Sequence, residues 1–149
     1  MLNLAQNRLL RNFSAKKEIV AWFGLGSMGK FMSRNLAKNP DYKVYGFDPN
    51  ESCIKRATGT GVILNSNMSE VTQEADWIIT SLPNTKFSYD FYVEDQKVFD
   101  LVRKDAFMLD TSTIDPSTSA QMTKIARSKG KTFIDAPVTG AVPAAESGT

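Results

Sequence analysis

The stretch from residue 18 to residue 48 constrains the fold most, because it predicts a strand, a glycine-rich loop, a helix and a second strand. The apolar run EIVAWF (18–23) is typical of a buried strand, and KVYGF (43–47) of another. Between them, apolar residues recur with helical spacing until Asn39-Pro40 ends the helix. Within 31 residues this pattern predicts a βαβ unit, whose strands are parallel and whose helix covers one face of the sheet.

The same alternation of short apolar runs and helical segments continues over the rest of the chain. Further strands are expected at 61–64, 76–82, 106–110 and 132–138, and helices at 50–58, 69–75, 84–103 and 115–130. Strands that alternate with helices form a parallel sheet with helices on both faces. Because crossovers are right-handed, the expected fold class is α/β with a doubly wound, mostly parallel sheet.

Local signals add detail to three of these helices. Asn50 is expected to cap the helix at 50–58, and Asp115 the last helix, with Pro116 in its first turn. The helix at 84–103 is expected to be irregular, with a buried side formed by Phe87, Phe91, Val98 and Leu101.

Composition excludes several kinds of site. The chain of 149 residues has one cysteine and no histidine. A single cysteine excludes an internal disulfide and a multi-thiolate metal site, and Cys53 is expected to be a buried structural thiol. Without histidine, neither a Ser-His-Asp arrangement nor a histidine proton donor is available within this chain. We therefore expect one ordinary domain without a metal ion.

Basic charge is concentrated at the N-terminus. Of the 18 basic residues, four lie in residues 1–17, which hold none of the 16 acidic ones, so the remaining chain has a net charge of −2. No basic patch remains to indicate a nucleic-acid partner, and no apolar run approaches the roughly 18 residues of a membrane span. The leucines and arginines of 1–17 predict a mitochondrial transit peptide before a domain at 18–149, with a disordered basic tail as the alternative.

The loop directly after the first strand contains Gly24, Gly26 and Gly29. In this context Gly24 allows a tight turn, Gly26 lets a phosphate approach the backbone, and Gly29 lets the helix pack closely on the strand. Free N–H groups and the helix dipole then favour an anion. Asp48, after the second strand, is placed to bind ribose hydroxyls, although it also suits the turn DPNE. The loop is therefore predicted to hold the pyrophosphate of a dinucleotide rather than to be a plain turn.

Four blocks resemble the β-hydroxyacid dehydrogenase family, in family order, over about residues 18–149. They are FGLGSMGKFMSRNL (23–36), EADWIITSLPNT (74–85), LDTSTIDP (109–116) and DAPVTGAVPAAESGT (135–149). The first block resembles the family's cofactor signature, and the last its substrate-carboxylate loop. The resemblance implies a Rossmann-type dinucleotide-binding domain with NAD as cofactor, a small 3-hydroxyacid as substrate, and a homo-oligomer when full length.

The resemblance also implies the residues of the site. The cofactor-binding residues would be Gly24, Leu25, Gly26, Ser27, Met28, Gly29, Asp48, Leu82, Pro83 and Thr113. The substrate carboxylate would be held by Thr139, Gly140 and Ala141. A turn of small residues suits this role because it exposes backbone N–H groups to an anion.

Two departures from the family pattern bear on function. Ala141 replaces the second glycine usual in the carboxylate loop, which adds a methyl group where the substrate would approach. The family's catalytic lysine lies in a second, all-helical domain, and no lysine of this chain lies in a matching motif. We therefore expect a fragment of a dehydrogenase of the mitochondrial matrix, without its catalytic residue. The alternatives are a related reductase of semialdehydes or glyoxylate, and a non-catalytic nucleotide-binding scaffold.

Overall fold

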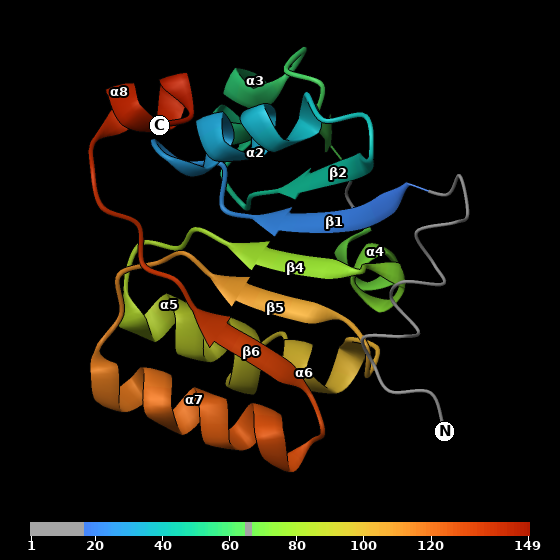
Figure 1. Ribbon diagram of the computed structural model, residues 1–149, viewed down its shortest axis with the longest axis vertical. Helices are drawn as coiled ribbons and strands as arrows, with labels where there is room; N and C mark the ends of the chain where they lie inside the picture. Colours follow the sequence, from blue (N-terminus) through green and yellow to red (C-terminus); the bar gives the residue numbers. More distant parts are fainter. Residues whose placement is uncertain (1–16, 65–66) are drawn as a thin grey trace.

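The computed structural model describes residues 17–64 and 67–149 (Figure 1). The expected transit segment at 1–17 lies outside this range, apart from Lys17. The described chain forms one sheet with helices on both of its faces.

All strands of the described chain are parallel and lie in the order β3-β2-β1-β4-β5-β6. Their bounds are β1 (Glu18–Phe23), β2 (Tyr42–Phe47), β3 (Ile63–Leu64), β4 (Trp77–Thr80), β5 (Phe107–Asp110) and β6 (Thr132–Asp135). The order runs outward in both directions from the neighbouring strands β1 and β4, which is the pattern of a doubly wound sheet. The expected fold class is confirmed.

Different helices cover the two faces of the sheet. On one face, α2 (Gly29–Ala37) and α3 (Glu51–Ala57) lie over the half formed by β1, β2 and β3. The other face carries α4 (Met68–Glu74), α5 (Thr85–Tyr89), the π-helix η1 (Asp90–Glu94), α6 (Val98–Leu101) and α7 (Pro116–Ser128). The last helix, α8 (Val142–Ser147), packs beside α2.

Each face has its own hydrophobic core, because successive side chains of a strand point to opposite faces. In β1, Val20 and Trp22 belong to the core beneath α2 and α3, which also buries Cys53 as expected. The alternate residues of β1 belong to the larger core beneath η1 and α7. There the ring of Tyr92 lies 5.1 Å, centroid to centroid, from the rings of both Phe99 and Phe133.

Both expected helix caps are present. The side chain of Asn50 accepts a hydrogen bond from the Ser52 N–H at the start of α3. Asp115 accepts from the N–H groups of Ser117 and Thr118 at the start of α7, where Pro116 occupies the first turn. These caps could be predicted because each satisfies N–H groups only two or three residues away.

Several strands are shorter than the sequence pattern predicts. β3 begins at 63 rather than 61, β4 spans 77–80 rather than 76–82, and β6 ends at 135 rather than 138. Pro83 and Pro137 lack the N–H group that a sheet ladder needs, so the chain leaves the sheet before each of them. The residues that follow β4 and β6, which the sequence pattern assigned to the strands, form loops of the candidate site.

The segment at 84–103 is irregular, as expected, but one residue of its predicted buried side is exposed. It consists of α5, η1 and α6, and Lys97 in the left-handed region (φ 49°) separates the last two. Phe91 and Val98 are buried, whereas Phe87 is 56% exposed and α5 buries Ser88 instead. Ser88 and Phe91 are three residues apart and share one helical face, whereas Phe87 lies beside that face in the first turn of α5.

Candidate functional site

The parallel strands place the predicted site residues along one edge of the sheet. Gly24 follows β1, Asp48 follows β2, and the loops after β4, β5 and β6 carry Leu82, Thr113 and Thr139. Ligands of doubly wound sheets bind at this carboxyl edge, where the strand order reverses, which here is between β1 and β4. Residues that are up to 115 positions apart in the sequence are thus brought to one side of the molecule.

Two glycines of the loop after β1 are required by the chain itself. Gly24 has φ +92°, and a Cβ there would lie 2.1 Å from the Ser81 carbonyl oxygen. A Cβ at Gly29 would lie 2.0 Å from the carbonyl oxygen of Gly24. Any side chain at either position would therefore collide with backbone, so these glycines fix the packing of α2 on β1 and β4.

Gly26 is different, because a Cβ there would meet no atom of the protein within 4 Å. Within residues 17–64 and 67–149, the N–H groups of Gly26, Ser27 and Met28 also find no acceptor. The helix that follows has no side-chain cap and no acidic residue in its first turn. Open space, free N–H groups and the positive end of a helix dipole form a cradle that fits the pyrophosphate of a dinucleotide.

Asp48 joins this cradle to the end of β2. Its Oδ2 accepts a hydrogen bond of 2.7 Å from the Leu25 N–H, and its Oδ1 accepts one of 2.8 Å from the Asn50 N–H. The second bond confirms that Asp48 organises the turn before α3. Each carboxylate oxygen can accept a further hydrogen bond, so the predicted ribose contact remains compatible with this geometry.

The loops after β4 and β5 form the other wall of the edge and are bonded to each other. The Leu82 N–H donates to the Ser112 hydroxyl at 2.8 Å, and the Asp115 N–H donates to the Thr85 hydroxyl at 2.9 Å. Leu82 is half-buried, whereas Pro83 and Thr113 are exposed. The two exposed residues, which the resemblance places against the cofactor, are therefore open to a ligand, on a loop pair held by Ser112 and Thr85.

A buried polar chain, which no sequence pattern predicted, lies beneath these loops. Tyr92, Thr80 and Asp110 are all fully buried. The Thr80 hydroxyl donates to Asp110 Oδ1 at 2.8 Å and lies 3.0 Å from the Tyr92 hydroxyl. Burial, and then the charge of Asp110, raises the pKa of Tyr92 well above its usual value, so the phenol stays protonated. The only sequence signal was an aspartate at the end of an otherwise apolar strand, in FMLD.

The loop after β6 leads into α8, a helix that no sequence pattern predicted. Thr139, Gly140 and Ala141 are all exposed, and Ala141 lies at the N-terminal boundary of α8. α8 is bound to α2, because Asn35 Nδ2 donates to the Ala145 carbonyl at 2.8 Å and the Arg34 guanidinium donates to that of Glu146 at 2.9 Å. The helix that carries the cradle at its start thus also holds the predicted carboxylate loop in place.

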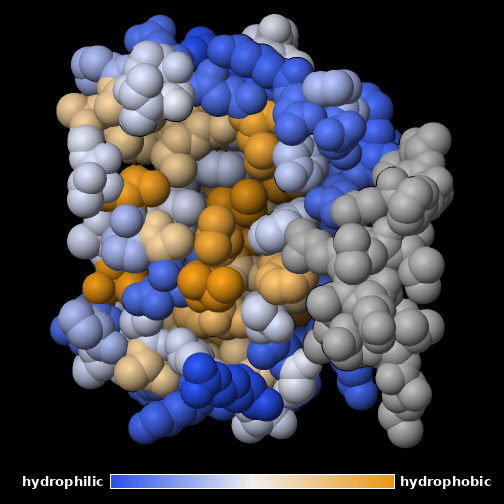
Figure 2. Space-filling view, in the orientation of Figure 1, coloured by the Kyte–Doolittle hydropathy of each residue, from blue (hydrophilic) through white to orange (hydrophobic). Residues whose placement is uncertain are grey.

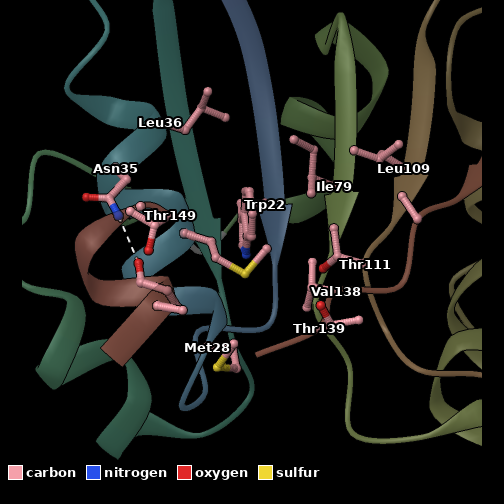
Figure 3. Close-up of a pocket in the computed structure, with 15 residues that line it drawn as sticks. Trp22, Met28, Asn35, Leu36, Ile79, Leu109, Thr111, Val138, Thr139 and Thr149 are labelled. Atoms are coloured by element: carbon pink, nitrogen blue, oxygen red, sulfur yellow. Dashed lines mark hydrogen bonds between the residues drawn. The ribbon is translucent and has the colours of Figure 1, made fainter. Parts of the chain in front are cut away.

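A cavity of about 610 Å³ lies between α2, α8 and the sheet (Figure 3). Met28 of the cradle and Thr139 of the predicted carboxylate loop both line it, and Thr111 lines it from the end of β5. Its floor is apolar and includes Trp22 and Ile79. One predicted cofactor residue, Met28, and one predicted substrate residue, Thr139, therefore border the same cavity, whereas the other predicted site residues do not line it.

The sheet face that carries α2 is apolar and only partly covered. Over β4, β5 and β6 no helix of residues 17–64 or 67–149 lies on this face, and Figure 2 shows it as an orange area at the centre of the view. Trp77 stacks on Phe107 there at 5.0 Å, and Ile134 is 48% exposed. Such a surface marks a site of contact with further protein or ligand.

Two further properties concern the described part of the chain. Within it, no group of three or more His, Cys, Asp or Glu side chains is arranged to hold a metal ion. None of its helices combines the length and the apolar character that crossing a membrane requires.

Comparison with known proteins gives consistent matches. The mitochondrial 3-hydroxyisobutyrate dehydrogenase of Rattus norvegicus is 37% identical over 134 residues, covering 90% of this chain and 40% of that protein. The 2-(hydroxymethyl)glutarate dehydrogenase of Eubacterium barkeri is 34% identical over 130 residues, covering 87% of this chain and 43% of that protein. A solved 3-hydroxyisobutyrate dehydrogenase of Mycobacterium tuberculosis with L-serine has a TM-score of 0.81 at 33% identity, covering 89% of this chain and 44% of the other.

The chain thus spans less than half the length of these relatives. A family model, described as the NAD-binding domain of 6-phosphogluconate dehydrogenase, matches residues 19–149. That range begins within β1 and includes every loop of the carboxyl edge. The chain belongs to this family of NAD-binding domains, and NAD is its cofactor.

Proposed function

We propose that this chain is the NAD-binding part of a mitochondrial 3-hydroxyisobutyrate dehydrogenase. The complete enzyme would oxidise 3-hydroxyisobutyrate to methylmalonate semialdehyde with NAD, a step of valine breakdown in the matrix. The observation that carries the proposal is the shared cavity, because it joins the open cradle at Met28 to the predicted carboxylate loop at Thr139. The 37% identity to the rat enzyme supports the choice of substrate.

In this proposal each loop of the carboxyl edge has one task. The N–H groups at 26–28 hold the pyrophosphate, Asp48 binds the adenosine ribose, and Leu82, Pro83 and Thr113 border the nicotinamide half. Thr139, Gly140 and Ala141 bind the substrate carboxylate through a hydroxyl and backbone N–H groups. NAD itself supplies the hydride acceptor, and the chain supplies binding and orientation.

No residue of this chain is assigned to take the proton of the substrate hydroxyl. The resemblance places that lysine in a second, helical domain, and the relatives are more than twice as long as the matched part. We propose that the complete protein includes such a domain and forms homo-oligomers. The partly covered apolar face over β4, β5 and β6 is the surface on which further protein would pack.

A second hydroxyacid is the main competing substrate. The identity to 2-(hydroxymethyl)glutarate dehydrogenase, at 34%, is close to that for the rat enzyme. Ala141 adds a methyl group to the carboxylate loop, which would alter the fit of the acid. Two functions of lower rank are a reductase of semialdehydes or glyoxylate and a non-catalytic nucleotide-binding scaffold.

One experiment separates these functions. The complete protein would be purified and assayed for NADH formation from 3-hydroxyisobutyrate, from 2-(hydroxymethyl)glutarate, and without substrate. We expect the highest kcat/KM for 3-hydroxyisobutyrate. A higher value for the glutarate would reassign the substrate, and NAD binding without turnover of any hydroxyacid would favour the scaffold.

The proposed location has its own test. An acid-free segment with Arg8 and Arg11 predicts import into mitochondria and cleavage near Phe13 or Ser14. N-terminal sequencing of the protein recovered from mitochondria should find a start near these residues. Molecules that mostly retain Met1 or Leu2 would show that the segment is only a tail.

A further inference from the structure

Asp110 is a buried carboxylate that accepts hydrogen bonds and donates none. It is 0% exposed at the end of β5, and its Oδ1 accepts from the Thr80 hydroxyl and from the Ser112 N–H at 3.0 Å. Because the single proton of the Thr80 hydroxyl is used on Asp110, the Tyr92 hydroxyl must be the donor to Thr80. All donors in this chain of bonds therefore point toward Asp110.

The negative charge of Asp110 is not neutralised by its surroundings. Its second oxygen, Oδ2, is buried and has no hydrogen-bond partner within residues 17–64 and 67–149. No Lys or Arg of this part of the chain forms an ion pair with it.

Asp110 lies directly beneath the loops assigned to the nicotinamide half. Its Oδ1 binds the N–H of Ser112, the neighbour of Thr113, and the Ser112 hydroxyl accepts from the N–H of Leu82. A charge held in a low-dielectric interior acts over a longer range than one in water. The nicotinamide ring is positively charged in NAD⁺ and neutral in NADH, so a nearby fixed charge distinguishes the two forms.

We propose that Asp110 sets the preference between the oxidised and reduced nucleotide by attracting the nicotinamide cation of NAD⁺. The proposal rests on the function proposed above, which places the nicotinamide beside Thr113. The effect would favour binding of NAD⁺ and release of NADH, as suits an enzyme that oxidises a hydroxyacid. Asp110 does not touch the nucleotide; it acts through its charge.

The expected size follows from Coulomb's law. Two unit charges about 8–12 Å apart, at an effective dielectric constant of about 20, change an affinity by roughly 10- to 30-fold. Salt and local relaxation reduce this value, so we expect a change of about 5- to 30-fold.

The test is Asp110→Asn, which keeps the shape and the acceptor oxygen but removes the charge. Calorimetric titration of the 149-residue chain would measure NAD⁺, NADH and ADP-ribose, which lacks the nicotinamide. The variant should bind NAD⁺ about 5- to 30-fold more weakly and leave NADH and ADP-ribose unchanged. Tyr92→Phe is the matched control, because it shortens the same polar chain but retains the charge, and it should leave the ratio of NAD⁺ to NADH affinity unchanged.

The remaining outcomes are also decisive. Equal weakening of all three ligands by Asp110→Asn would show a purely structural role and overturn the proposal. A second outcome is that the wild-type chain binds NAD⁺ and NADH no more tightly than ADP-ribose. In that case the nicotinamide does not lie at Thr113, and the proposed function fails instead. If Asp110→Asn does not fold, as judged by circular dichroism, the wild-type chain decides: NAD⁺ bound more tightly than NADH supports the proposal, and the reverse order overturns it.

Discussion

At residue 26 a side chain would meet no protein atom within 4 Å, whereas at residues 24 and 29 it would collide with backbone. These glycines therefore serve different purposes, although the sequence motif presents them as equivalent. Gly24 and Gly29 are needed for folding. Gly26 is needed only if something outside the chain occupies the space above it, which the proposed pyrophosphate would do.

This difference gives a matched pair of variants. Gly26→Ala should leave the melting temperature unchanged or slightly raised, because the unfolded chain loses entropy and no clash arises, while NAD affinity falls at least about 10-fold. Gly24→Ala should lower the melting temperature, because it combines a positive φ with a contact of 2.1 Å. Thermal denaturation and calorimetric titration would measure both. Full NAD affinity in Gly26→Ala would contradict the cradle.

Asp48 is the residue that we propose decides between NAD and NADP. Its carboxylate should accept hydrogen bonds from the ribose diol of NAD and repel the 2′-phosphate of NADP, and no basic residue follows in DPNES to offset this repulsion. Because Asp48→Ala removes a charge-assisted hydrogen bond of this kind, the affinity of the variant for NAD should fall roughly 10- to 150-fold.

The control for this prediction is Asp48→Asn. It retains an acceptor for the Leu25 N–H, which lies 2.7 Å from the carboxylate, but loses the charge that excludes NADP. The Asn variant should therefore keep the fold, and its affinities for NAD and NADP should differ less than those of the wild-type chain. Comparable dissociation constants of the wild-type chain for NAD and NADP, measured by titration calorimetry, would remove Asp48 from this role.

At the scale of elements, the docking of α8 on α2 is the feature that the sequence could not predict. α8 has only six residues, too few for a periodic pattern or for stability in isolation. It forms because Asn35 and Arg34 bind the carbonyl groups at its C-terminal end, more than 100 residues along the chain. By contrast, the caps at Asn50 and Asp115 were predictable because each involves only its own helix start. The prediction for Phe87 was wrong because helical spacing allows the buried face of this segment to include either Phe87 or Ser88, and packing against the core selects Ser88.

The docking of α8 can be weakened at one side chain. Asn35→Ala removes the 2.8 Å hydrogen bond to the Ala145 carbonyl, which is worth about 1 kcal/mol, so amide exchange in α8 should become roughly five-fold faster. Lys30→Ala is the control, because Lys30 lies on the same helix and its ammonium lies over the ring of Phe31. Hydrogen exchange read by mass spectrometry should show the change at 142–147 and leave β1 protected. Equal rates of amide exchange at 142–147 in both variants would mean that Asn35 does not hold α8.

At the scale of the whole molecule, the topology was predictable and the coverage of the sheet was not. Six apolar runs that alternate with helices specify a doubly wound parallel sheet, since each strand is followed by a crossover of one hand. The same pattern does not indicate which part of a sheet face is left without a covering helix. The apolar runs of β4, β5 and β6 would look alike whether a helix covered them or not. Only the placed elements show that Ile134, 48% exposed, lies on a face that no helix of residues 17–64 or 67–149 covers there.

The sheet face that no described helix covers, and the proposal that the proton acceptor lies in a second domain, lead to the last prediction: the 149-residue chain alone binds NAD but does not turn over. Oxidation of an alcohol needs a group that takes the hydroxyl proton, and the chain has no histidine. The acids nearest the site have structural interpretations, since Asp115 caps α7, Asp135 ends β6, and Asp110 is buried beneath the loops. Loss of a proton acceptor costs about 10²–10⁴ in rate, and an open cleft that admits water and leaves the substrate unoriented lowers the rate further. The chain should therefore show NAD binding by calorimetry and, with 3-hydroxyisobutyrate, no NADH absorbance above a control without protein. Saturable turnover by this chain would show that it carries its own acid–base group, and that the proposed division of tasks between the two domains is wrong.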